Sequence, residues 1–301
     1  MTTHDARPAA ADDTDLGFHV ERSRPGDPLL VAFGGMAGAG NPTLFEFGRL
    51  TRDVPSQRCL LRDHQRAWYH HGVRGAGDDL ASVERLLRRV VDETQPERIV
   101  MVGVSTGGYA AMLFGHRVGA DVVHAFSPQT FLDPVLRRRH REPRWSAETA
   151  ALMASGRADT TALDLAVALR TPTADRVPAI HLWYCPSEQP DAVHATHVIE
   201  VPAVTLHCVP HGDHLLVKWL RDEGHLIPIL ASALAGDPRR PSRTRSRHAC
   251  VRRPISSTCC GGAGGCSSTA AAPGRRADRS AGRPGAAVTH LPPPATCDPR
   301  C

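Results

Sequence analysis

Six short apolar segments occur between residues 28 and 209, and polar residues or glycine follow most of them. They are PLLVAFGG, QRCLLRD, ERIVMVG, ADVVHAFSP, AIHLWYC and AVTLHCV, at residues 28–35, 57–63, 97–103, 120–128, 179–185 and 203–209. Short continuous apolar runs are typical of strands buried on both faces of a parallel sheet, whereas half-exposed strands alternate apolar and polar positions. The pattern therefore predicts six central strands.

Helical patterns separate these segments. Residues 77–94 place Leu80, Val83, Leu87 and Val90 three or four apart, with acidic residues in the first turn, where the helix dipole favours negative charge. A helix rich in small residues is predicted at 107–119, and a pair of helices at 215–234. Strands that alternate with helices predict an α/β fold, with a mostly parallel sheet that helices cover on both faces.

The composition changes sharply near residue 237. Residues 237–301 contain twelve Arg, no Lys, three Asp, no Glu and none of the chain's 14 aromatic residues. Such a segment cannot bury enough apolar surface to offset the entropy of ordering it, so we expect a disordered basic tail. We accordingly divide the chain into a flexible N-terminus at 1–24, one α/β domain at 25–236 and the tail at 237–301.

Charge follows the same division. The tail carries a net charge of +9 and the whole chain +5, so residues 1–236 carry −4. A nucleic-acid footprint requires basic residues on a folded face, and we therefore expect no nucleic-acid partner.

Cys59, Cys185 and Cys208 of the domain follow no disulfide or zinc spacing. With no signal peptide and no apolar run long enough to span a bilayer, the sequence favours a cytoplasmic protein without a membrane partner.

A G-x-S-x-G motif directly follows the strand predicted at 97–103. It comprises Gly103, Val104, Ser105, Thr106 and Gly107, and a predicted helix begins immediately after it. This strand–turn–helix setting is the one in which the motif presents a nucleophilic serine. The tight turn needs glycines beside the serine, and the helix N-terminus directs backbone N–H groups toward developing negative charge. Ser105 is therefore the candidate nucleophile.

Candidate partners follow in the chain order that this arrangement requires, an acid and then a histidine. Glu188 and Asp191 come after the strand at 179–185, and His211 and His214 come after the strand at 203–209. Asp191 precedes a predicted helix and His214 opens the final helical pattern, so we favour this pair. Glu188 and His211 are the alternatives. Zinc binding by His211, Asp213 and His214 lacks a further spaced ligand, so no metal or other cofactor is expected.

The loop GGMAGAG at residues 34–40 resembles a phosphate-binding loop only in part. Asn41 and Pro42 stand where a P-loop requires Lys and Ser or Thr. We interpret the loop instead as one side of an oxyanion hole. Gly35 or Met36 would supply one backbone N–H group, and Thr106, the residue after the serine, would supply the other.

Across residues 28–234 the chain resembles the α/β-hydrolase superfamily, and within it a group of poorly characterised bacterial α/β-hydrolase-like proteins. The matching strings are LLVAFGGMAG, LLRD followed by WYHHG, VGVSTGGYAAMLFG, AFSPQTF and PHGDHLLVKWL. The resemblance implies an α/β-hydrolase fold with nucleophile Ser105, acid Asp191 and base His214. It places a small cap insertion at about 129–177, which also contains the charge run at 137–141, interpreted as a solvated face.

Together these features predict a serine hydrolase that cleaves an ester, thioester or amide of a small-molecule acyl substrate. Acyl transfer by the same triad is one alternative, and a non-catalytic binding or accessory protein with this fold is another. Arg62, Asp63, Trp68, Tyr69 and His70 belong to a matching string without an assigned role. They either line the mouth of the pocket or, in the case of Arg62 and Asp63, form a structural ion pair. The sequence leaves the oligomeric state open.

Overall fold

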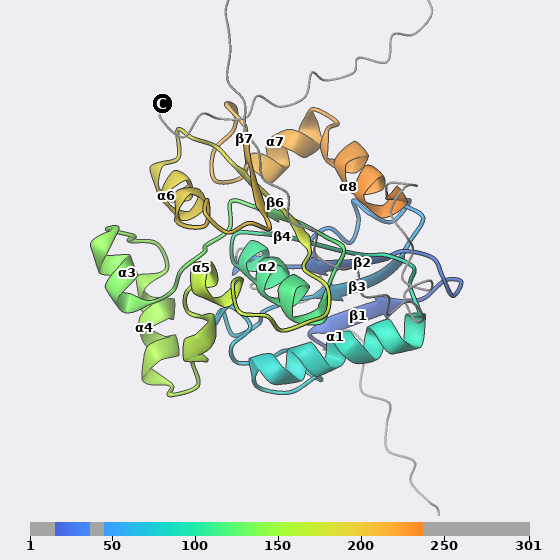
Figure 1. Ribbon diagram of the computed structural model, residues 1–301, viewed down its shortest axis with the longest axis horizontal. Helices are drawn as coiled ribbons and strands as arrows, with labels where there is room; N and C mark the ends of the chain where they lie inside the picture. Colours follow the sequence, from blue (N-terminus) through green and yellow to red (C-terminus); the bar gives the residue numbers. More distant parts are fainter. Residues whose placement is uncertain (1–15, 37–44, 237–301) are drawn as a thin grey trace, which may run out of the picture. The chain divides into compact units, whose positions relative to one another are not determined.

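A computed structural model describes residues 16–36 and 45–236 of the chain. The predicted tail at 237–301 and most of the loop after the first predicted strand lie outside the described residues. The described residues form one seven-stranded sheet with the order β1-β3-β2-β4-β5-β6-β7 (Figure 1). Its strands are β1 (Phe18–Glu21), β2 (Leu29–Phe33), β3 (Gln57–Leu61), β4 (Ile99–Val104), β5 (Val122–Phe126), β6 (Ala179–Tyr184) and β7 (Val204–Cys208).

The six predicted strands are confirmed, and the six run parallel to one another. The edge strand β1 was not predicted, because the sequence analysis assigned residues 1–24 to a flexible N-terminus. It pairs antiparallel with β3. Its four residues, FHVE, are all half-buried, and so short an alternation of apolar and polar positions gives almost no periodic signal.

Successive residues of the central strands point to opposite faces of the sheet, and each face is buried in its own apolar core. Leu29, Val31 and Phe33 of β2 pack with α1 (Leu80–Thr94) and α2 (Thr106–Val118). Leu30 and Ala32 pack instead with α7 (Leu216–Asp222) and α8 (Leu226–Ala235) (Figure 1). This two-sided burial explains why the strands are continuous apolar runs.

A helical insertion connects β5 to β6, as the sequence predicted for residues 129–177. It contains α3 (Pro134–Arg139), α4 (Ser146–Ala154), the 3-10 helix η3 (Thr160–Ala162) and α5 (Leu165–Ala168). In Figure 1 these elements gather at the left, beside α6 (Gln189–His197). The charge run at 137–141 is exposed except for Arg137, which is buried and donates hydrogen bonds to the carbonyl oxygens of Glu142 and Arg144.

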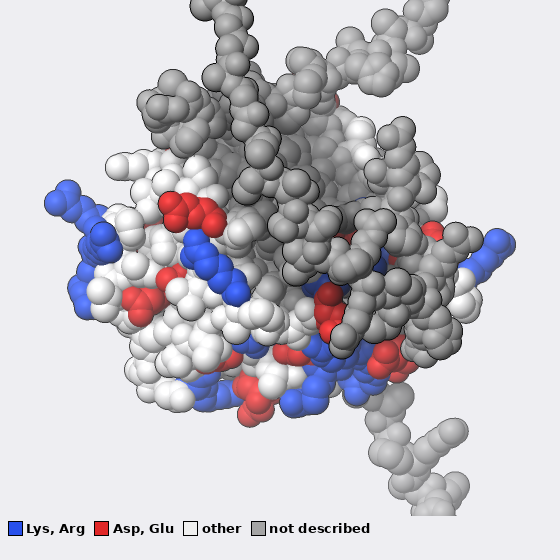
Figure 2. Space-filling model, in the orientation of Figure 1, with Lys and Arg blue, Asp and Glu red and all other residues white. Residues whose placement is uncertain are grey.

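Charged side chains of both signs are interspersed on the described part of the face shown in Figure 2. Ion pairs of the described residues include Arg88 with Glu84 one helical turn away and Arg117 with Asp159. Such pairs neutralise one another locally. Among the residues that the structure describes, no helix has the length and apolar character needed to cross a membrane.

Candidate active site

Ser105 occupies a strained turn between β4 and α2. Its backbone angles are φ 53° and ψ −116°, outside the conformations that a serine adopts without strain. Its amide N–H donates to the carbonyl oxygen of Phe126 on β5 at 2.9 Å, which fixes the turn against the neighbouring strand. The side chain is only 7 % exposed. This geometry places the hydroxyl at the carboxyl edge of the sheet, where open α/β sheets bind ligands.

Two glycines make the turn possible. A Cβ atom at Gly103 would lie 2.1 Å from the carbonyl oxygen of Gly107, and one at Gly107 would lie 2.2 Å from the carbonyl oxygen of Phe33. Neither contact leaves room for a side chain. The glycines of the G-x-S-x-G motif therefore permit the close approach of β4, α2 and β2 on either side of the serine.

The structure brings Ser105, His214 and Asp191 together from three separate segments. His214 Nε2 lies 3.2 Å from Ser105 Oγ. On the other side of the ring, Nδ1 lies 2.9 Å and 3.0 Å from the two carboxylate oxygens of Asp191. Asp191 is the third residue of α6 and is 1 % exposed. All three distances are within hydrogen-bonding range, in the order expected of a nucleophile, a base and an acid.

The carboxyl group of Asp191 is held ionised. Burial by itself raises the pKa of Asp191, but the hydrogen bond and charge of His214, together with those of Arg144, outweigh burial and hold that pKa below its ordinary value. An ionised carboxylate at this position accepts the Nδ1 proton of the imidazole. That proton leaves the lone pair of Nε2 directed at the serine.

The alternative acid and base lie elsewhere. Glu188 is the N-cap residue of α6, and its side chain makes no capping hydrogen bond. His211 is exposed, and its ring packs against Trp219 with the ring centroids 5.4 Å apart. Neither side chain contacts Ser105 in the hydrogen bonds of the described residues, so the geometry favours Asp191 and His214.

Sequence analysis did not single out Arg144, which precedes α4 in the insertion. Arg144 Nη1 donates to Asp191 Oδ1 at 2.6 Å and lies 3.2 Å from His214 Nδ1. The other two guanidinium nitrogens donate to the two carboxylate oxygens of Glu142, at 2.9 Å and 2.7 Å. Arg144 lies in an arginine-rich stretch, and no periodicity or spacing distinguishes it from its neighbours.

Of the predicted oxyanion residues, Thr106 directly follows the serine and Gly35 lies beside Val104 and Thr106, but the N–H group of Gly35 is already bonded. The amide of Gly35 donates to Glu46 Oε2 at 2.7 Å. Thr106 is the first residue of α2, so its N–H group has no partner within the helix. Its side-chain Oγ1 is buried with no hydrogen-bond partner among the described residues. Met36 is buried at the end of the described part of this loop.

The unassigned string after β3 supports the same loop. Tyr69 Oη donates to the carbonyl oxygen of Gly34 at 2.9 Å, and Trp68 Nε1 donates to Gln129 Oε1 at 2.7 Å. Asp63 accepts hydrogen bonds from the amides of Gln65, Ala67 and Tyr69, and these bonds shape the turn. The string is thus a buried structural support. The hypothesis that it lines the pocket mouth does not hold for Trp68 and Tyr69, which are fully buried.

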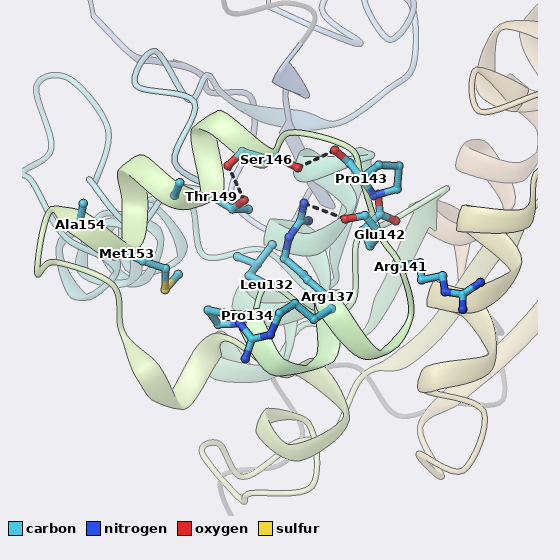
Figure 3. Close-up of a pocket in the computed structure, with 12 residues that line it drawn as sticks. Leu132, Pro134, Arg137, Arg141, Glu142, Pro143, Ser146, Thr149, Met153 and Ala154 are labelled. Atoms are coloured by element: carbon cyan, nitrogen blue, oxygen red, sulfur yellow. Dashed lines mark hydrogen bonds between the residues drawn. The ribbon is translucent and has the colours of Figure 1, made fainter.

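Two cavities are lined by residues that contact or directly follow those of the candidate site, although the lining of neither includes Ser105, Asp191 or His214. One of about 420 Å³ is bounded by residues 45–50 on one side and by α7 on the other, with Glu46 and Leu215 in its wall. A larger, open one of about 860 Å³ lies between α3 and α4 (Figure 3). Its wall contains Glu142, the residue that Arg144 contacts, together with Leu132, Arg137 and Met153. Leu215, in the wall of the smaller cavity, directly follows His214 in the chain. Glu46, also in that wall, accepts the hydrogen bond from the amide of Gly35.

In sequence, no family model matches the chain, and no curated protein matches it. Solved structures match its fold at low identity. The fluorophosphonate-binding serine hydrolase F of Staphylococcus aureus aligns with a TM-score of 0.50 and 14% identity, over 70% of this chain and 85% of that one. The capsule O-acetyltransferase of Neisseria meningitidis serogroup A aligns with a TM-score of 0.52 and 11% identity, over 72% and 92%. These likenesses establish the fold alone.

Proposed function

Because the chain has the α/β-hydrolase fold, we propose that it is a serine hydrolase that cleaves an ester, thioester or amide through an acyl-enzyme on Ser105. One observation carries the proposal. The hydroxyl of Ser105, on a strained turn, lies 3.2 Å from an imidazole nitrogen whose other nitrogen contacts a buried carboxylate. A serine hydroxyl is a weak nucleophile until a positioned base removes its proton, and this arrangement supplies that base.

The reaction would proceed in two halves. Ser105 Oγ attacks the acyl carbonyl carbon while its proton passes to His214 Nε2, giving a tetrahedral oxyanion. Collapse of this intermediate breaks the bond to the alcohol, thiol or amine, which leaves with the proton from His214. A water molecule, deprotonated by His214, then attacks the acyl-enzyme and releases the carboxylic acid and free Ser105.

The oxyanion needs two backbone donors. We assign them to the N–H group of Thr106 and to that of Gly35 or Met36. Each such donor typically contributes about 3–4 kcal/mol to transition-state stabilisation. If Gly35 is the second donor, Glu46 must release its N–H group when the oxyanion forms, since the carboxylate accepts that N–H in the structure.

The smaller cavity suits the acyl chain. Phe45, Phe47, Leu50 and Leu226 give it apolar walls, and Leu215 joins it to the segment that carries His214. Burial of methylene groups there would contribute about 0.8 kcal/mol each. We therefore expect kcat/KM for p-nitrophenyl esters to rise from acetate to a medium-length chain.

Covalent labelling tests the proposal. A fluorophosphonate should modify the full-length protein on the peptide that contains Ser105, and mass spectrometry of the digest should locate the adduct. Ser105→Ala should remove the label, and His214→Ala should slow labelling strongly. A folded wild-type protein that is neither labelled nor active on any short ester would favour a non-catalytic binding role instead.

Acyl transfer uses the same apparatus with a different second nucleophile. The fold shared with the capsule O-acetyltransferase keeps this alternative open. Addition of a primary alcohol during turnover of a p-nitrophenyl ester separates the two. Hydrolysis gives only the free acid, whereas a transferase gives mainly the new ester, at an unchanged or increased rate of p-nitrophenol release.

A further inference from the structure

Four ionisable side chains form a connected row that begins at the carboxylate beside His214. In order, they are Asp191, Arg144, Glu142 and His194. Asp191 and His194 lie three residues apart on α6 and so share one face of that helix. Glu142 and Arg144 come from the insertion and lie across this face. Arg144 contacts Asp191, Glu142 contacts His194 Nε2 at 3.0 Å, and Arg144 joins Glu142 through two hydrogen bonds. The insertion is therefore attached to the very helix that carries the candidate acid.

Protonation states along the row are well defined. The amide of Thr130 donates to His194 Nδ1 at 3.0 Å, so the ring proton sits on Nε2 and is donated to Glu142. Burial lowers the pKa of His194 to about 4, although Glu142 acts in the opposite direction. Burial raises the pKa of Glu142, but hydrogen bonds from His194 and Arg144 reverse this and place it well below its ordinary value. Neutral His194 thus leaves two carboxylates to be balanced by Arg144.

Arg144 is held in place by the backbone as well. The buried side chain of Arg137 donates to the carbonyl oxygens of Glu142 and Arg144, which fixes the loop between α3 and α4. The side chains of Asp191 and Glu142 are 0 % and 1 % exposed, whereas that of Arg144 is 21 % exposed. Buried carboxylates left without a cation are strongly destabilised, so Arg144 has a definite electrostatic role here.

We propose that Arg144 is a positioning residue of the catalytic centre, which orients Asp191 toward His214 Nδ1 and opposes protonation of His214. The kinetic consequence rests on the proposed function, while the electrostatic one does not. The groups that face the imidazole are Ser105 on the turn before α2, Asp191 on α6 and Arg144 on the insertion. Arg144 Nη1 lies 3.2 Å from Nδ1, so the positive charge that the ring gains when Nε2 takes up a proton would lie close to the charge of the guanidinium.

The charge of Arg144 should therefore keep His214 neutral, and able to act as a base, at lower pH. In Arg144→Gln the carboxylate of Asp191 faces His214 without its cationic partner, and the imidazolium becomes easier to form. We expect the midpoint of the acid limb in the pH profile of kcat/KM to rise by about one pH unit. The midpoint in the pH profile of the fluorophosphonate labelling rate should rise by the same amount. In Arg144→Lys the positive charge remains, so the limb should stay near that of the wild type even though the bidentate contact with Glu142 is lost.

Arg117→Gln is a matched control. It breaks the ion pair between Arg117 and Asp159, which also ties the insertion to the sheet domain, with side chains 16 % and 33 % exposed. Neither residue contacts the serine, the histidine or Asp191 in the described hydrogen bonds. Arg117→Gln should lower stability without moving the acid limb. An acid limb unchanged in Arg144→Gln, or moved equally in Arg117→Gln, would overturn the proposal.

Nuclear magnetic resonance can follow the protonation of His214 without a measurement of enzymatic activity. The imidazole nitrogens of His214, assigned by comparison with His214→Gln, can be titrated in the full-length protein whether or not it turns over an ester. A midpoint that rises by about one pH unit in Arg144→Gln, and is restored in Arg144→Lys, supports the positioning role even if Ser105 is never labelled. Labelled, active wild-type protein with an unchanged midpoint in Arg144→Gln contradicts the positioning role and leaves the proposed function intact.

Discussion

Tyr69 donates a hydrogen bond from its hydroxyl to the carbonyl oxygen of Gly34, at 2.9 Å, and so holds the peptide group whose N–H belongs to Gly35. The same peptide donates that N–H to Glu46 at 2.7 Å. A single peptide plane beside the candidate nucleophile is thus fixed on both edges. Because an oxyanion donor must be oriented before the reaction begins, this restraint bears directly on catalysis.

Tyr69→Phe should lower kcat by about tenfold on a p-nitrophenyl ester, because the Gly34–Gly35 peptide loses the bond that orients it without occupying its N–H group. The substitution also removes a buried hydrogen bond, and we expect a loss of about 1–2 kcal/mol in the free energy of unfolding. Tyr109→Phe is the matched control, since Tyr109 Oη donates to the carbonyl oxygen of Ala162 at 2.8 Å and lies 2.9 Å from His70 Nε2, and it bonds to neither Gly34 nor Gly35. A similar fall in kcat in both variants would show that lost stability, rather than loop geometry, is responsible.

Glu46→Ala should increase kcat. Burial raises the pKa of Glu46, although the hydrogen bond from Gly35 opposes this. The carboxylate occupies an N–H group that we assign to the oxyanion, so each turnover has to break this charge-assisted bond. The hydrogen bond from Gly35 to Glu46 is worth about 1.5–3 kcal/mol, and its removal should raise kcat by about tenfold. The measurement is the rate at a saturating concentration of the ester.

Glu46→Gln retains an uncharged acceptor and should give a smaller increase than Glu46→Ala. A fall in kcat in both variants would mean that Glu46 supports the loop, with Met36 rather than Gly35 as the second donor. Thr106→Val provides a further comparison, because it removes the buried hydroxyl and leaves the backbone N–H in place. It should change kcat little if only the amide of Thr106 stabilises the oxyanion.

His214→Ala should reduce kcat/KM by about a thousandfold or more, because no other base would contact Ser105. His211→Ala should retain most of the activity, since that side chain is exposed and packs on Trp219. The two residues lie three positions apart in the same loop. His211→Ala therefore controls for a perturbation of the loop, whereas His214→Ala removes the proposed base as well. Loss of activity in His211→Ala alone would identify His211 as the base.

Sequence alone could predict the six parallel strands, since short, mostly apolar segments alternate with helical patterns, and burial is complete along β2, β4 and β5 although not along β6 and β7. It could also predict Ser105, because a serine between glycines at a strand–helix junction is typical of a nucleophile held on a tight turn. Asp191 and His214 followed from chain order, but Glu188 and His211 remained open, since a choice between neighbours depends on which side chain the loop directs inward. That direction is set by contacts between segments.

Arg144 and Glu46 show where sequence reasoning stops. Arg144 contacts Asp191 across 47 positions in the chain, and Glu46 contacts Gly35 across 11. Arg144 lies in a charged stretch and Glu46 between two phenylalanines, and neither spacing nor periodicity marks either residue as a contact of the site. The short strand β1 was missed for a related reason: its position depends on pairing with β3 more than on its own four residues. Such features depend on tertiary packing.

Three neighbouring histidines on β5, β6 and β7 make stability depend on pH. The rings of His124 and His181 lie 5.0 Å apart, and His181 Nδ1 lies 2.8 Å from His207 Nε2. Burial, with smaller contributions from His181 and His207, lowers the pKa of His124 to about 3. The ring is therefore neutral in the folded protein, while in the unfolded chain it takes up a proton below about pH 6.5. Stability attributable to His124 is accordingly present above about pH 6.5 and is lost as the pH falls toward about 3.

His124→Asn removes this titration and keeps an acceptor for Trp183 Nε1, which donates to His124 Nδ1 at 3.1 Å. Urea unfolding at pH 7 and pH 5 should show that the wild type loses about 2 kcal/mol more than His124→Asn between the two conditions. Val122→Ala, on the same face of β5, controls for destabilisation that involves no titrating group, and it should lose as much as the wild type. An equal loss in His124→Asn and the wild type would mean that His124 already carries a proton in the folded protein at pH 5.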